Sequence, residues 1–182
     1  GVRAESYQKY GRYAQAEILW LRNLEGTREI LGDDHETTQK AMENLARFYL
    51  QTTQFSKAEP LYKKLLALRQ SVYGEANESV AEIHTYLGHV YGHHGRDALA
   101  EANYWRALTI FEQLLGNEHR KTSAALGNLG TSYYQQGKFA EAEALLKRAL
   151  AISEKSGSGQ APDHAAALYN LAVLYQEKNR LA

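Results

Sequence analysis

The sequence predicts an all-α protein, an α-solenoid built from antiparallel helix pairs. Three observations favour this fold class. A set of residues recurs every 42 positions, the apolar residues of each unit follow the period of an α-helix, and helix-forming residues dominate while only Pro60 and Pro162 interrupt them. Because proline is the least favourable residue inside a helix, its scarcity permits long helices along most of the chain.

The repeat is visible in several columns of residues that keep one register. Segments with a shared pattern begin at Gly11, Thr53, Gly95 and Gly137, each 42 positions after the one before. The same spacing relates the members of three further columns: Tyr7, Tyr49, Tyr91, Tyr133 and Tyr175; Leu45, Leu87, Leu129 and Leu171; and Gly32, Gly74 and Gly116. A fixed period of this length indicates stacked units, each of which touches only its neighbours.

Each unit contains two helical stretches. In the first, residues of one helix face occupy positions i, i+3, i+4 and i+7, namely Leu126, Leu129, Gly130 and Tyr133. A turn that holds Gly137 follows, and the second stretch begins at Phe139. It is expected to end near a glycine equivalent to Gly116, which suits a left-handed helix cap.

Small residues recur on both helices and predict close packing within each pair. They are Ala4, Ala46, Gly88, Gly130 and Ala172 on the first helix, and Ala16, Ala58, Ala100 and Ala142 on the second. Small side chains let two helices approach near the short end of the usual range of interaxial distances. We expect the tyrosine column, together with the column Trp20, Tyr62, Tyr104 and Leu146, to fill the core beside them.

The expected organisation is a single array over residues 1–182. Its parts are a partial repeat (1–31), three full repeats (36–74, 79–116 and 121–157) and a partial repeat with a first helix only (163–182). The last helix, about Asp163 to Lys178, has no partner helix, so we expect an apolar face there and possible self-association through the terminal helices. Because the first residue is Gly1 and no helix start signal precedes Val2, we expect the chain to be part of a longer protein.

Composition and charge exclude several classes of function. Lys plus Arg number 21 and Asp plus Glu number 21, so the basic excess of a nucleic-acid binder is missing. No apolar run approaches the roughly 20 residues that span a bilayer, and no signal peptide is visible. The absence of cysteine excludes disulfides and thiolate chemistry. We expect a cytoplasmic protein without nucleic-acid or membrane partners.

The repeat columns resemble those of the tetratricopeptide repeat, which places a small residue, Leu and Tyr on the first helix and Ala on the second. The usual unit has about 34 residues, and the 42-residue unit is similar to the kinesin light chain type. The segments that carry this likeness are Leu129–Glu143, Leu115–His119 and Leu31–His35. The resemblance implies a right-handed superhelix whose concave wall is formed by the first helices. Two loops depart from it: 73–77 lacks the usual histidine, and 156–162 is expected to be a more flexible joint.

The resemblance also implies a peptide-binding groove along that wall. Its residues stand one position before the core leucine of each first helix and then three and seven positions further on. They are Asn44, Arg47 and Gln51; Tyr86, His89 and His93; Asn128, Thr131 and Gln135; and Asn170, followed by Val173 and Glu177. In families of this type asparagine grips the peptide backbone, because its amide offers both a donor and an acceptor. The alternative is that these polar residues are merely solvated.

Families of this type use two further modes of peptide recognition. The clamp for a terminal carboxylate needs bases where this chain has Glu5, Asn44, Glu82 and Tyr86, so that clamp is not expected. A preference for acidic peptides is expected only near Arg47.

Catalysis and cofactor binding are not expected. His89 and His93 have the i, i+4 spacing of a metal-binding pair, but no third ligand completes a zinc motif, so we interpret them as groove histidines. The acidic column Glu17, Glu59, Glu101 and Glu143 lies in separate units and is interpreted as surface or loop-pairing residues. The sequence therefore predicts a non-enzymatic module that binds a protein or peptide, with no metal and no cofactor. The alternative is a scaffold or spacer within a larger protein.

Overall fold

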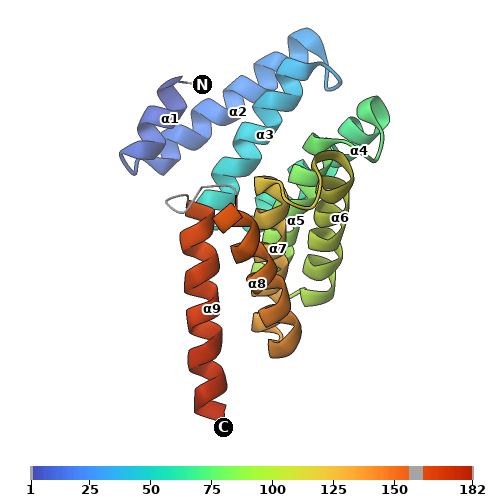
Figure 1. The fold of residues 1–182 in the computed structure, drawn as a ribbon. Coiled ribbons are helices and arrows are strands. Elements are labelled where there is room, and N and C mark those ends of the chain that lie inside the picture. Colours follow the sequence, from blue (N-terminus) through green and yellow to red (C-terminus); the bar gives the residue numbers. More distant parts are fainter. Residues whose placement is uncertain (1, 156–161, 182) are drawn as a thin grey trace. The chain divides into compact units, whose positions relative to one another are not determined.

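The computed structural model describes residues 2–155 and 162–181, and all regular secondary structure in these ranges is α-helical (Figure 1). The chain divides into two compact units, residues 1–72 and 73–182. Each unit is built from helices that pack against one another, and the predicted all-α fold of helix pairs is confirmed. None of the described helices is both long enough and apolar enough to cross a membrane.

Unit 1 contains the first four helices. They are α1 (Val2–Lys9), α2 (Tyr13–Leu31), α3 (Glu36–Gln51) and α4 (Phe55–Tyr73), of which only the last residue belongs to unit 2. Helix α2 packs against both α1 and α3. Helix α4 is joined to α3 by an ion pair of 2.7 Å between Arg69 and the buried Glu43. Burial opposes the charged form of Glu43, but Arg69 and Lys40 hold its pKa below the usual value.

Unit 2 contains five helices, α5 (Glu78–His93), α6 (Asp97–Leu115), α7 (Arg120–Gln135), α8 (Phe139–Lys155) and α9 (Pro162–Leu181). Helices α5 and α6 form one antiparallel pair and α7 and α8 form the next, as Figure 1 shows. The first helices of successive repeats also touch, because α7 contacts both α5 and α9. These three helices therefore form a common wall within unit 2.

The turns between paired helices require a left-handed backbone. Gly11, Gly95 and Gly137 have φ values of 71°, 66° and 74°, which glycine adopts without steric cost. Thr53 occupies the same place in its repeat with φ 58°, and it is the one residue other than glycine with positive φ in the described ranges. Thus all four tight turns share one geometry although one of them lacks glycine.

The helix starts explain another recurring position. His35 and His119 stand at the N-caps of α3 and α7, where each Nδ1 accepts a hydrogen bond of 3.1 Å from the backbone N–H two residues later. Asn77, in the loop that lacks the histidine, caps α5 in the same way at 2.9 Å. The column of His, Asn and His is therefore a column of helix caps.

The small-residue columns have the expected steric role. A Cβ on Gly88 would lie 2.5 Å from Cε1 of Tyr104, and a Cβ on Gly130 would lie 2.8 Å from Cγ of Leu146. The large partners are themselves core residues, as predicted, since Tyr104 and Leu146 are buried. In α9 the equivalent Ala172 is exposed, because no second helix of the described ranges covers it.

The acidic column links successive repeats. The Tyr49 hydroxyl on α3 donates to Glu17 on α2 at 3.0 Å, and Lys57 pairs with the same carboxylate at 2.8 Å. The arrangement recurs where Tyr133 and Lys138 contact Glu101, at 3.0 and 2.9 Å. The hydrogen bond from Lys57 is the largest cause that holds the pKa of Glu17 below its usual value. These glutamates are therefore structural residues that pair with the tyrosine column.

Candidate functional site

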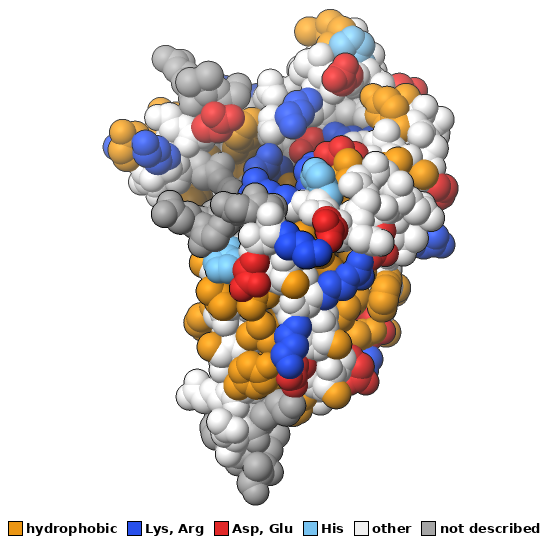
Figure 2. All heavy atoms as spheres, in the orientation of Figure 1, with side chains coloured by type: hydrophobic (Ala, Val, Ile, Leu, Met, Phe, Trp, Pro, Cys, Tyr) orange, Lys and Arg blue, Asp and Glu red, His pale blue; other side chains and the backbone are white. Residues whose placement is uncertain are grey.

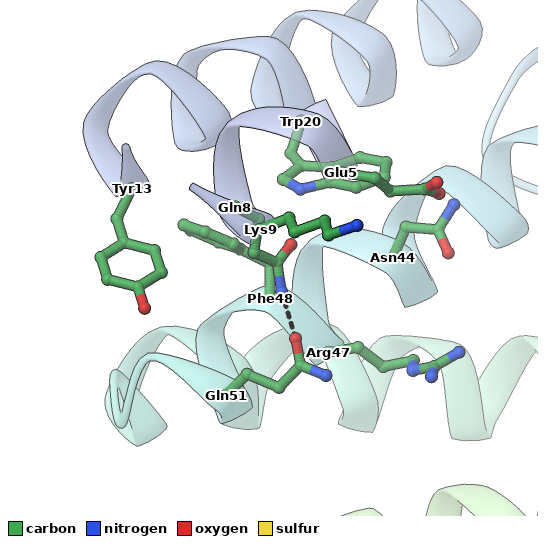
Figure 3. A pocket seen from close by; sticks show the side chains of 9 residues that line it. All are labelled: Glu5, Gln8, Lys9, Tyr13, Trp20, Asn44, Arg47, Phe48 and Gln51. Carbon is green, nitrogen blue, oxygen red and sulfur yellow. Dashed lines mark hydrogen bonds between the residues drawn. The ribbon is translucent and has the colours of Figure 1, made fainter. Parts of the chain in front are cut away.

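The wall positions predicted from the repeat line a hollow in unit 1 (Figure 3). It has a volume of about 510 Å³ and lies between α1, α2 and α3. Asn44, Arg47 and Gln51 of α3 border it, and Glu5, Gln8 and Lys9 of α1 border it from the other side. The Gln8 amide donates a hydrogen bond to the Gln51 side chain across the hollow. Asn44 is half-buried and Arg47 is exposed, and neither side chain has a hydrogen-bond partner within the described ranges.

Two of the lining residues, Glu5 and Lys9, are not among the residues predicted for the peptide groove, although Glu5 stands at a position of the carboxylate clamp. They stand 42 positions before Arg47 and Gln51, so the same register would have found them. The hollow is also lined by Trp20 of α2, a buried core residue.

Unit 2 has two adjoining hollows along α5 and α7. The first, of about 200 Å³, is lined by the predicted residues His89, His93, Asn128, Thr131 and Gln135. Asn128 also borders the second, of about 170 Å³. The shared residue makes the two hollows neighbours on one surface.

The second hollow differs from the first in its chemistry. Tyr86, the residue that breaks the asparagine column, lines it together with Phe111, Ala124 and Ala125. Lys121 stands at its edge and forms ion pairs with Glu78 and Glu82 of α5. This hollow is therefore mainly apolar, whereas the first hollow is lined by hydrogen-bonding side chains such as Asn128, Thr131 and Gln135.

His89 lines the first hollow and also contacts the core residue Tyr104. Its Nδ1 is 3.0 Å from the Tyr104 hydroxyl, and the two rings meet edge to face. Burial, and secondarily the charge of His93, hold the pKa of His89 below its usual value. Burial likewise raises the pKa of Tyr104. Both groups are therefore neutral near pH 7.

Asn170 lies in the same wall but is engaged with a neighbouring repeat. Its amide donates to the Thr131 hydroxyl at 3.0 Å, and that hydroxyl donates to the Gly127 carbonyl at 2.9 Å. Asn44 and Asn128, in contrast, form no side-chain hydrogen bond within the described part of the chain. The three asparagines predicted as one column thus differ in how far their amides are free for a ligand.

The histidine pair does not belong to a larger metal-binding cluster. Within residues 2–155 and 162–181, no three His, Asp or Glu side chains come together in a way that could hold a metal ion. His93 lines the first hollow together with His89.

Stacked helix pairs with hollows along their first helices define a helical repeat protein of the solenoid class. The tetratricopeptide repeat family model matches residues 2–71, 37–113, 79–155 and 121–182, and the chain belongs to this family. Among curated proteins, none matches the chain.

Solved structures similar to this chain include repeat proteins of the kinesin light chain type. A protein of Podosopora anserina, described as a kinesin light chain with nearly identical TPR-like repeats, has a TM-score of 0.80 and 24% identity, over 97% of this chain and 84% of the other. A single-substitution variant of it has a TM-score of 0.82 with the same identity and coverage. BtubC (BKLC) from P. vanneervenii has a TM-score of 0.84 and 26% identity, over 97% of this chain and 70% of the other.

Proposed function

We propose that the chain binds an extended peptide segment of another protein along the first-helix wall of each unit. Tetratricopeptide repeats mediate protein–protein interaction, and this likeness supports the general class of function. The specific proposal rests on the unpaired side-chain amides of Asn44 and Asn128. Both line hollows, and neither forms a side-chain hydrogen bond within the described residues.

A free asparagine amide at the edge of a hollow suits a peptide backbone. It donates to a peptide carbonyl and accepts from a peptide N–H, so it can pair with one peptide unit whatever the side chain. The two hollows that border Asn128 add selectivity for the side chains of the peptide. The apolar hollow beside Tyr86 suits an apolar side chain, and the polar hollow beside Thr131 and Gln135 suits an uncharged polar one. Ordering a flexible peptide offsets much of the contact free energy, so we expect about micromolar affinity.

The test is a selection of binders from a library of short random peptides, followed by titration of the enriched peptides. Asn128→Ala should weaken binding of peptides that occupy unit 2 by about tenfold, because about 1.4 kcal/mol of hydrogen bonding is lost. Gln113→Ala is the matched control, since Gln113 is exposed on the second helix α6. Both variants should melt as the wild type does. No enriched peptide, or equal loss in both variants, would contradict the proposal.

A second candidate function, assembly through the terminal helix, is favoured by one observation. Leu168 of α9 is 47% exposed, whereas Leu126 at the equivalent position of α7 is fully buried. Tyr169 and Tyr175 of α9 are exposed as well, and in Figure 2 hydrophobic side chains gather in the part of the view where Figure 1 places α8 and α9. An exposed apolar face of this kind is typical of an interaction surface.

Sedimentation equilibrium tests this candidate. If α9 mediates self-association, the wild type forms dimers or larger assemblies at high concentration, and Leu168→Gln shifts it toward monomer. Leu114→Gln is the control, because Leu114 is 45% exposed on the second helix α6. A wild type that stays monomeric at every concentration rules self-association out.

A further inference from the structure

Successive repeats are joined by a recurring set of side chains. A tyrosine of the first helix donates a hydrogen bond to a glutamate of the preceding second helix, and a lysine that lies over the tyrosine ring pairs with the same carboxylate. In α7, Tyr133 and Lys138 hold Glu101 of α6 at 3.0 and 2.9 Å, and the ammonium lies 4.8 Å from the ring centre. Each such joint therefore fixes a second helix by its glutamate.

Helix α1 carries the same two receiving groups in unit 1. Tyr7 and Arg12 stand in the columns of Tyr133 and Lys138, three 42-residue repeats earlier. The Arg12 guanidinium lies 6.0 Å from the centre of the Tyr7 ring. Neither side chain forms a hydrogen bond or an ion pair within the part of the chain whose side chains the structure describes. The pair is thus arranged as in a repeat joint, but it holds no described carboxylate.

The surface around this pair is open. It forms a hollow of about 650 Å³ that is lined by Ser6, Tyr7, Tyr10 and Arg12. Tyr10 is 74% exposed, whereas the equivalent Gln136 of α7 is half-buried. Ser6 is exposed, whereas the equivalent Ser132 is 6% exposed. Because α7 packs against the preceding second helix α6, the hollow on α1 lies where a second helix would pack in an internal joint.

We propose that this hollow is a docking site for an amphipathic α-helix of another protein, anchored by a glutamate on its docking face. The glutamate carboxylate accepts a hydrogen bond from the Tyr7 hydroxyl and pairs with the Arg12 guanidinium. The Tyr10 ring offers an apolar surface to the neighbouring turn of the docked helix. None of the residues that line the hollow belongs to the predicted peptide groove, so the proposal does not rest on the peptide-binding function.

A second copy of this chain has no joint glutamate to offer. Glu17, Glu101 and Glu143 are each bound by a tyrosine of the following first helix, and Glu59 also has a partner within the described residues. To dock one of them in the hollow of another copy would remove a charge-assisted hydrogen bond from an internal joint. The docked glutamate therefore comes from a different protein.

The probe is a labelled synthetic peptide with the sequence of α6 (Asp97–Leu115), because α6 forms this joint in unit 2. Its binding to the full chain is measured by fluorescence anisotropy, and we expect weak affinity because a free helix of this length is only marginally stable in water. Glu101→Gln in the peptide should weaken binding about tenfold, and Tyr7→Phe in the chain should do the same. The two changes together should weaken binding little more than either one, because they remove the same hydrogen bond.

Matched variants separate the hollow from other surfaces. Tyr169→Phe removes a hydroxyl from a tyrosine of α9 that is 69% exposed, and it should leave binding of the α6 peptide unchanged. Arg12→Gln should weaken binding about threefold, because an exposed ion pair contributes little free energy. Arg22→Gln removes the same charge from an exposed site on α2 and should have no effect. All the substituted side chains are at least partly exposed, so the variants should melt as the wild type does.

Four results would overturn the proposal. The first is that the α6 peptide does not bind at all. The second is that Leu168→Gln abolishes binding while Tyr7→Phe leaves it unchanged, which would place the peptide on α9. The third is that Asn128→Ala weakens binding as much as Tyr7→Phe does, which would place the peptide in the predicted groove. The fourth is self-association of the wild type in sedimentation equilibrium that Tyr7→Phe abolishes, which would make a second copy the occupant.

Discussion

At the residue scale, Thr53 has a backbone conformation for which its side chain is unsuited. It forms the turn between α3 and α4 with φ 58°, where the other three tight turns have glycine. Left-handed geometry costs a residue with a Cβ about 1–2 kcal/mol, and part of this is offset by the higher chain entropy of unfolded glycine. The hydroxyl of Thr53 also donates to the Thr52 carbonyl at 2.7 Å.

We therefore predict that Thr53→Gly raises the free energy of unfolding by about 0.5–1 kcal/mol, as measured by urea denaturation. The reciprocal change Gly137→Thr should lower it by about 1–2 kcal/mol, because it introduces the strain into a turn that lacks it. Destabilisation by Thr53→Gly would show that the threonine contributes a contact that outweighs its conformation.

His89 makes stability depend on pH. Its folded pKa is held below the unfolded value by burial and by His93, so the unfolded state binds more protons as the pH falls. The contribution of neutral His89 is fully present above the unfolded pKa of about 6.5 and is lost progressively as the pH falls below it. We predict that the wild type loses stability between about pH 7.5 and about pH 5.5, and that His89→Gln loses less over this range. Identical slopes in denaturation experiments at these pH values would contradict this assignment.

At the element scale, each capped first helix has one N-cap side chain that accepts a hydrogen bond from a backbone N–H of its first turn. His119 caps α7 through Nδ1, and Asn77 caps α5 through its amide oxygen. We predict that His119→Asn leaves the melting temperature nearly unchanged, whereas His119→Ala lowers the free energy of unfolding by about 1 kcal/mol. The measurement is thermal and urea unfolding of both variants. If they behave alike, the cap contributes no stability.

Pairing of α5 with α6 depends on the missing side chain at Gly88. An added Cβ would meet the ring of Tyr104 at 2.5 Å, and the ring is also tied to His89. We predict that Gly88→Ala destabilises the protein by about 1–2 kcal/mol through overpacking. Gly127→Ala, in the middle of α7 with no atom near its added Cβ, is the matched control. It should stabilise by up to about 1 kcal/mol, because alanine is the better helix former. The same sign for both changes would contradict close packing at Gly88.

At the scale of the whole molecule, most of what the sequence could predict followed from the 42-residue repeat. It placed the helix pairs, the buried columns around Tyr104 and Leu146, and the wall positions that line the hollows. It did not indicate that Asn170 donates to Thr131, because such a contact depends on side-chain rotamers across two repeats. Nor did inspection of single columns reveal the pairing of Glu17 with Tyr49. That pairing joins two columns with a constant offset of 32 positions, which becomes meaningful only when successive helices are known to touch.

The most direct test of the account is an NMR titration of the side-chain amides with a peptide enriched from the random library. The central claim is that ligands lie on the first helices and not on the second. We predict that the amide signals of Asn44 or Asn128 shift on binding, while those of Gln113 on α6 and Asn23 on α2 stay in place. Shifts confined to Gln113 or Asn23, with Asn44 and Asn128 unmoved, would contradict the claim.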